Sequence, residues 1–342
     1  MLVKSSSPVP PKFHRINHSI PHPTPELHIS VPFMWKLRQI ELLLLKQQRL
    51  SDKSIRKMVL QMDIEMNYGT DYKYIPALSI RSGTGIEVLP DLYQHTIQIV
   101  NIFLYGHPKT DDFVLIDAGM PHSAQKIISV IQERFGENKN PKAIILTHGH
   151  FDHVGAIIEL VNHWNIPVYA HPLELPFLTG KESYPEPDAT VEGGLIAKMS
   201  PMFPVEPIQL GNHVHPLPAD GQIPYMPDFR WIHTPGHSPG HISLFRENDG
   251  LLIAGDAFVT VRQDALFNVL IQQKEINGPP RYLTTDWQQA WDSVKKLEAL
   301  NPQIAVTGHG LPISGDELTT DLAKLVLHFS EMAIPEYGKY LN

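Results

Sequence analysis

Residues 147–156, THGHFDHVGA, follow directly on the apolar run AIIL at positions 143–146. They place four metal-ligating side chains within six positions: His148, His150, Asp152 and His153. A turn that leaves a buried strand and enters a helix can direct several side chains toward one point, which is where α/β proteins hold their sites. Imidazole nitrogens and carboxylate oxygens both suit a divalent ion, above all zinc. Four such groups exceed what one tetrahedral ion takes from a single loop, so the spacing predicts two ions side by side.

The composition excludes several classes of protein. With 342 residues, 42% of them hydrophobic and 19% charged, the chain is long enough to bury a large core. The formal net charge of −8 is spread along the sequence without a dense Lys/Arg block, which argues against nucleic acid as a partner. The chain has no cysteine, so thiolate ligands and nucleophiles are excluded and any metal site depends on histidine. Without an apolar leader or a run long enough to span a bilayer, we expect a cytoplasmic protein that does not enter a membrane.

The chain changes character near residue 83. Residues 1–33 are rich in Pro, Ser and His, which suggests an extended arm, and residues 34–66 show the apolar spacing of helices. We therefore expect an N-terminal arm and helical extension over residues 1–82 and a catalytic domain over residues 83–342. From residue 83 strands and helices alternate, which predicts the α/β class. The expected strands cover residues 96–104, 113–116 and 143–146, and the expected helices cover residues 123–135, 154–161, 287–300 and 318–332.

The pattern HxHxDH at positions 148–153 resembles the signature of the metallo-β-lactamase-fold hydrolases. Four further segments are similar to that family's motifs and occur in the same order: LIDAG at 115–119, HTPGHSPGH at 233–241, LIAGD at 252–256 and AVTGHG at 305–310. Together the five motifs cover about residues 83–335. The resemblance implies a four-layer αββα metallo-β-lactamase-like sandwich, here with an N-terminal helical extension.

The resemblance also implies a ligand set. One ion would be held by His148, His150 and His237. The other would be held by Asp152, His153 and His309, with Asp256 and a water or hydroxide bridging the two. We expect two Zn²⁺ per chain, although manganese, iron or cobalt can take their place, because availability in the cell decides as well as ligand preference.

Two aspartates have further expected roles. Asp152 could orient the nucleophile and pass its proton to the leaving group, which makes it the predicted catalytic residue. Asp117, in the LIDAG motif, is expected to hydrogen-bond a ligand histidine and so fix the tautomer of that ring. His241, four residues after His237, is expected to be structural.

Substrate contacts are expected from outside the motifs. The candidates are His171, Tyr225, Phe267 and Tyr282, although an ordinary solvated or hydrogen-bonded histidine is the favoured interpretation of His171. Residues 172–207 are too long and too apolar for a plain connector, which predicts either a lid over the cleft or a dimer contact. A homodimer through the lid or the N-terminal extension is therefore an alternative, and residues 262–287 are expected to form another pocket wall.

The family resemblance narrows the reaction. Asp256 stands where the true β-lactamases of this fold have Cys or Ser, and His150 stands where the flavin-dependent di-iron relatives have Glu. The lactonases of the family often have a Tyr three residues after the bridging Asp, where this chain has Val259. We expect a hydrolase for a small-molecule lactone or carboxylic ester. The alternatives are a thioester hydrolase of glyoxalase-II type, a sulfur dioxygenase with a single iron, and a metal-binding module without catalysis.

Overall fold

The structure is a computed structural model that describes residues 65–73, 75, 77, 79–192 and 194–341. The chain divides into two compact units, residues 1–62 and 63–342, and every described residue belongs to the second. The predicted arm of residues 1–33 and nearly all of the predicted helical segment 34–66 lie outside the described residues. Within 65–82, Ile75 is buried in the core and Tyr68 and Tyr72 pack against it.

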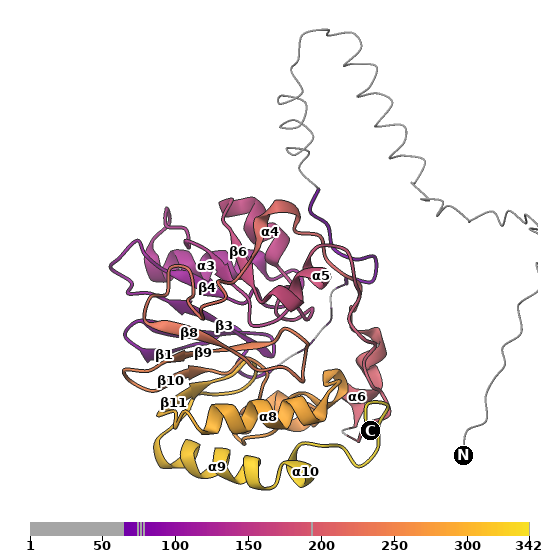
Figure 1. The fold of residues 1–342 in the computed structure, drawn as a ribbon. Coiled ribbons are helices and arrows are strands. Elements are labelled where there is room, and N and C mark those ends of the chain that lie inside the picture. Colours follow the sequence, from indigo (N-terminus) through magenta and orange to yellow (C-terminus); the bar gives the residue numbers. More distant parts are fainter. Residues whose placement is uncertain (1–64, 74, 76, 78, 193, 342) are drawn as a thin grey trace, which may run out of the picture. The chain divides into compact units, whose positions relative to one another are not determined.

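Two β-sheets form the middle of the unit (Figure 1). The larger sheet has the order β1-β2-β3-β4-β5-β6-β7, with antiparallel pairs from β1 to β4 and parallel pairs from β4 to β7. Its strands are β1 Gly85–Leu89, β2 Leu92–Ile97, β3 Val100–Tyr105, β4 Val114–Ile116, β5 Ile144–Ile145, β6 Val168–Ala170 and β7 Val214–Pro216. The smaller sheet has the order β12-β11-β10-β9-β8. Its strands are β8 Phe229–His233, β9 Ile242–Arg246, β10 Leu251–Ile253, β11 Ile304–Val306 and β12 Ile313–Ser314.

Helices cover the outer face of each sheet (Figure 1). The helices of the described residues are α3 Ala124–Phe135, α4 Ile157–Trp164, α5 Leu175–Leu178, α6 Leu195–Met199, α7 Leu266–Ile271, α8 Trp287–Glu298, α9 Gly315–Leu327 and α10 Phe329–Met332. The helices α3 and α4 lie over the larger sheet, and α8 and α9 lie over the smaller one. The predicted four-layer αββα sandwich is therefore confirmed. Within the described part of the chain, no helix is both long and apolar enough to cross a membrane.

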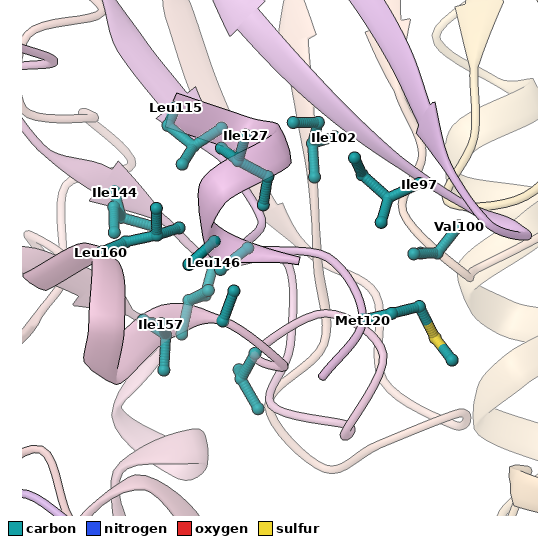
Figure 2. Close-up of a cluster of buried hydrophobic side chains, with 14 of the residues drawn as sticks. Ile97, Val100, Ile102, Leu115, Met120, Ile127, Ile144, Leu146, Ile157 and Leu160 are labelled. Atoms are coloured by element: carbon teal, nitrogen blue, oxygen red, sulfur yellow. The ribbon is translucent and has the colours of Figure 1, made fainter. Parts of the chain in front are cut away.

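Apolar side chains fill all three interfaces between these layers. Along β4, Leu115 belongs to the cluster under the helices and Ile116 belongs to the cluster between the sheets. Because successive strand residues point to opposite faces, a strand buried on both faces is apolar throughout, as this one is. Figure 2 shows Ile127 of α3 and Leu160 of α4 gathered with Leu115 and Ile144 in the helix-facing layer.

Two predicted elements are divided in the structure. The single strand expected over residues 96–104 is wrong, because β2 and β3 form a hairpin with a turn at Gln98 and Ile99. Gln98 takes a φ of 59°, and no Gly, Asn or Asp marks this turn in the sequence. The last helix begins earlier than expected, at Gly315, and is interrupted at His328, whose φ and ψ of −115° and 30° leave the helical region.

The carboxyl ends of several strands meet at one edge of the sandwich. The strands β4, β5, β8, β10 and β11 all lead into motif loops. Backbone hydrogen bonds join the loops, from Ile242 N to Thr147 O at 2.9 Å and from Gly308 N to Gly255 O at 2.9 Å. This edge therefore holds the chemistry-bearing residues, as the topology of α/β sheets favours.

Candidate metal centre

All seven predicted ligands meet at this edge and are buried. Three overlapping groups have one ligand atom per residue within 4.8 Å of each other: His148, His150 and His237; His148, His153 and Asp256; Asp152, His153 and His309. Asp152 and His153 lie in a turn closed by His153 N to His150 O at 2.9 Å, and α4 begins after this turn, at Ile157 rather than at residue 154 as expected. The chain thus brings side chains from positions 148 to 309 into one cluster.

Asp256 faces members of all three groups. Its Oδ2 atom lies 3.5 Å from His237 Nε2, 3.6 Å from His153 Nε2 and 3.3 Å from His309 Nε2. The Oδ2 atom of Asp152 lies 3.3 Å from the same His309 nitrogen. A carboxylate surrounded by imidazole nitrogens in this way has the place that a ligand shared by two ions would need.

Several atoms of the cluster are buried without a hydrogen-bond partner. They are His148 Nε2, His153 Nε2, Asp152 Oδ1 and Asp256 Oδ1. In addition, His150 Nδ1 and His237 Nε2 lie 2.9 Å apart, so two potential acceptors face each other. Burying polar atoms without partners is costly, and all of these atoms are of the type that binds zinc or a similar ion. The donor set therefore fits a metal centre.

The remaining ring nitrogens have partners that orient the histidines. His153 Nδ1 donates to Asp117 Oδ2 at 2.8 Å, and His309 Nδ1 donates to the carbonyl oxygen of Ile99 at 2.9 Å. His237 Nδ1 lies 3.2 Å from the hydroxyl oxygen of Thr284, which itself donates to Pro280 O. With Nδ1 protonated, Nε2 of each ring is left free for an ion.

Asp117 also holds the histidine loop. Its Oδ1 atom accepts from Thr147 N and its Oδ2 atom accepts from the Thr147 hydroxyl, both at 2.8 Å. The Thr147 hydroxyl in turn lies 3.1 Å from His148 Nδ1. Asp117 is fully buried with a φ of 60°, a region that Asp and Asn enter more readily than most residues. One carboxylate thus fixes both the strand-to-loop turn and the His153 tautomer.

Burial and charge act in opposite directions on these histidines. Burial lowers the pKa of His150 to about 4 and holds the pKa of His148 and His237 well below 6.5, so the three rings are neutral, which is the form that binds metals. Burial also acts to lower the pKa of His309, but Asp256 and Asp152 raise it to about 10. The two carboxylates therefore favour positive charge at this place, as a metal ion would supply.

The predicted residues outside the ligand set differ in their surroundings. His241 is buried, with Nε2 accepting from Asp256 N at 2.8 Å and Nδ1 3.1 Å from Thr234 O, so both ring nitrogens are already engaged. His171 stacks on His233 with 4.3 Å between ring centroids, at the ends of β6 and β8. Tyr225 and Phe267 are 54% and 66% exposed, and neither forms a hydrogen bond, ion pair or ring contact with a predicted ligand.

Tyr282 is the substrate candidate that lies beside the cluster. It is buried, and its phenol pKa is raised by burial and by the nearby Asp152 and Asp256 carboxylates. Its ring packs against Phe203 at 5.6 Å, and Phe203 packs against Phe151 at 5.1 Å. This aromatic wall, defined as Phe151, Phe203 and Tyr282, includes a residue of the predicted lid 172–207, whose opening stays a prediction.

Sequence reasoning missed Thr284, Ile99 and Glu174, which contact the ligand histidines or their loops. Glu174 lies in the 3₁₀ turn Pro172–Glu174 after β6 and is fully buried. Thr284 and Ile99 each contact a ligand histidine through a single oxygen atom, and no local sequence pattern predicts such contacts. The one available signal for Glu174 is that an acidic residue closely follows the apolar strand at 168–170.

Comparisons with known proteins agree with this geometry. A family model described as the metallo-beta-lactamase superfamily matches residues 95–309. The probable metallo-hydrolase YflN of Bacillus subtilis is 48% identical over 260 residues, which cover 76% of this chain and 98% of that protein. The hydroxyacylglutathione hydrolase GloC of Haemophilus influenzae is 29% identical over 200 residues, covering 57% and 79%. Among solved structures, the subclass B3 metallo-beta-lactamase BJP-1 of Bradyrhizobium japonicum shares the fold with a TM-score of 0.50 at 19% identity, covering 75% of this chain and 94% of that one.

Proposed function

The chain belongs to the metallo-beta-lactamase superfamily, and we propose that it is a metal-dependent hydrolase that opens an ester-type bond in a small molecule at two metal ions. The observation that carries the proposal is the convergence of seven buried ligand-type side chains with unpartnered atoms between them. His148, His150 and His237 would hold one ion, and Asp152, His153 and His309 the other. Asp256 would contact both. A second complete group supports two ions rather than the single iron of a dioxygenase.

The residues around the ions have separable tasks in this proposal. Bound ions would lower the pKa of a water molecule toward neutrality and polarise the carbonyl of the substrate. Asp152 has an unpartnered Oδ1 atom inside the cluster, which lets it accept the proton of the attacking water and pass it to the leaving oxygen. The phenol of Tyr282, kept protonated by its raised pKa, can donate to the carbonyl oxygen.

The surroundings favour an uncharged ester or lactone. The aromatic wall lies beside Asp152, since Phe151 is its neighbour in the chain and Tyr282 is influenced by its charge. Arg281, the neighbour of Tyr282 in the chain, pairs with Glu192 at 2.9 Å and with Asp264 at 3.5 Å, so its charge is already balanced by carboxylates. An apolar acyl or alkyl group suits such a wall, whereas a multiply anionic substrate would lack a cationic partner there.

Thioester hydrolysis is the second candidate, because the similarity to GloC covers most of that hydroxyacylglutathione hydrolase. It would use the same ligands and the same Asp152. Thioesters and oxygen esters differ in the leaving atom, so a substrate panel separates the two candidates.

The test combines metal analysis with turnover. The purified chain should contain two ions, zinc in our expectation, and should hydrolyse chromogenic lactones or carboxylic esters faster than matched thioesters. Asp256→Asn should abolish turnover. The control is Asp91→Asn, which should retain turnover, because Asp91 pairs at 2.6 Å with Arg246, the last residue of β9. One iron per chain with oxygen uptake and no hydrolysis would refute the proposal, and faster thioester turnover would select the second candidate.

A further inference from the structure

Glu174 is a fully buried carboxylate outside the predicted ligand set. Four groups donate to it: Gly149 N at 2.9 Å, Gly240 N at 2.8 Å, the Ser238 hydroxyl at 2.8 Å and the Tyr184 phenol. Among the described residues, no lysine, arginine or histidine pairs with it. A buried charge without a cationic partner is costly unless several hydrogen bonds satisfy it, and here they come from one particular set of loops.

Three of the four donors belong to the two loops that carry the first ligand group, His148, His150 and His237. Gly149 stands between His148 and His150, and its N–H donates to Glu174 Oε2. Ser238 and Gly240 follow His237, and both donate to Glu174 Oε1. A single carboxylate therefore joins two segments that are about ninety positions apart in the chain, and the three ligands on these segments form one of the converging groups.

Two glycines allow this close approach. A Cβ atom on Gly240 would lie 2.7 Å from Glu174 Cγ and 2.7 Å from Glu174 N. A Cβ atom on Gly149 would lie 2.5 Å from the Tyr184 phenol oxygen and 3.3 Å from Glu174 Oε2. Tyr184 also packs edge-on against the His150 ring, at 4.6 Å between centroids. The two loops, the tyrosine and the carboxylate thus pack as one unit behind the first ligand group.

We infer that Glu174 is a positioning residue of the metal centre, which sets the separation between the His148/His150 segment and His237. Because its carboxylate accepts from both loops at once, it holds the three imidazoles at the spacing one ion requires. Its negative charge adds to the attraction for that ion. The inference rests on the two-ion centre of the proposed function but not on the substrate.

The test is Glu174→Gln. The amide oxygen can still accept from one loop, but the amide NH₂ then faces the donors of the other, so the two loops separate. We expect the affinity of the first site for Zn²⁺ to fall by about 10- to 100-fold, the size seen when groups that orient ligands are removed. The ion held by Asp152, His153 and His309 should be retained. The readout is competition with a chromophoric chelator, starting from metal-free protein, together with the absorption spectrum of the Co²⁺-loaded chain, which reports ligand geometry.

Matched variants separate positioning from stability. Glu87 is exposed and pairs with Arg134, so Glu87→Gln should change the affinity of neither metal site. Tyr184→Phe and Ser238→Ala each remove one donor and should weaken the first site by about fivefold, the equivalent of one hydrogen bond. If Glu174→Gln does not fold, these two variants decide, and unchanged affinity in both would overturn the inference.

The outcomes for function and for positioning are distinct. A Glu174→Gln chain that folds and holds both ions with wild-type affinity and an unchanged Co²⁺ spectrum would refute the positioning role, whatever the substrate. A wild-type chain that binds two ions but hydrolyses no ester, lactone or thioester would refute the proposed function and leave the positioning role intact.

Discussion

Replacing Asp117 by Asn should release the ion that depends on His153. The substitution keeps the shape of the side chain, and Asn tolerates the φ of 60° at this position. The amide oxygen can still accept from Thr147 N, but the amide NH₂ then faces His153 Nδ1 in place of Oδ2. If His153 keeps its proton on Nδ1, two donors face each other. If the proton moves to Nε2, that nitrogen is no longer free to bind the ion.

The size of the effect follows from the bond that is lost. The contact from His153 Nδ1 to Asp117 Oδ2 is a 2.8 Å hydrogen bond to a charged acceptor, worth about 1.5–3 kcal/mol. At about 1.4 kcal/mol per factor of ten, the affinity of the second site should fall by roughly 10- to 150-fold. Chelator competition at fixed pH measures this change, and ester turnover lost at limiting zinc should return partly at excess zinc.

Asp91→Asn serves as the control, because it removes a partly buried carboxylate charge that pairs with Arg246 and contacts no predicted ligand. It should lower the thermal midpoint without changing metal affinity. If Asp117→Asn retains both ions with wild-type affinity, the tautomer argument is wrong.

Three further predictions concern single sites. His241→Ala should keep both ions while lowering stability by about 1–3 kcal/mol, since it leaves Asp256 N without its acceptor, and loss of one ion per chain would contradict this assignment. His95 is buried with both ring nitrogens unpartnered, and burial lowers its pKa to about 4. Below pH 6.5 the unfolded chain takes up a proton on His95 that the folded chain does not. The contribution of neutral His95 to the free energy of unfolding is therefore complete above pH 6.5 and is lost as the pH falls toward 4. That loss should reach about 2 kcal/mol by pH 4.5 in urea unfolding and should be smaller in His95→Leu, whereas equal acid sensitivity would exclude His95 as the cause. Gly155→Ala should destabilise the fold by about 3 kcal/mol, because its Cβ would lie 2.1 Å from Met120 C, while Gly194→Ala, with nothing within 4 Å, should cost less in the same thermal scan.

The local pattern around the ligands was sufficient to predict most of the site. His148, His150, Asp152 and His153 are spaced within one loop after an apolar strand, and the later motifs each end a strand. Positions at the carboxyl ends of the strands lie close together in an α/β sheet, so the sequence predicts that the site lies at this edge of the sandwich. The helix boundaries of α3 and α8 were also close, because apolar periodicity and a cap at Asp286 are local signals.

Other features depended on the tertiary structure. The turn at Gln98 has no turn residue in its sequence, and the apolar character of both flanking strands conceals it. The sequence offers Tyr225, Phe267 and Tyr282 as equal substrate candidates, and only the fold shows that Tyr225 and Phe267 are exposed whereas Tyr282 is buried within the influence of Asp152 and Asp256.

The sequence by itself determined which side chains could bind metal and which fold would gather them, because residue type and the spacing along strands and loops are local properties. For Asp117 the sequence predicted a ligand histidine, and the structure identifies it as His153. The tertiary structure alone decided that Ile99 and Thr284 orient His309 and His237, and that Glu174 is the carboxylate that joins the two ligand loops. These contacts are single hydrogen bonds between segments distant in the chain. Their partners are often backbone atoms, which every residue has, so neither periodicity nor composition predicts these contacts.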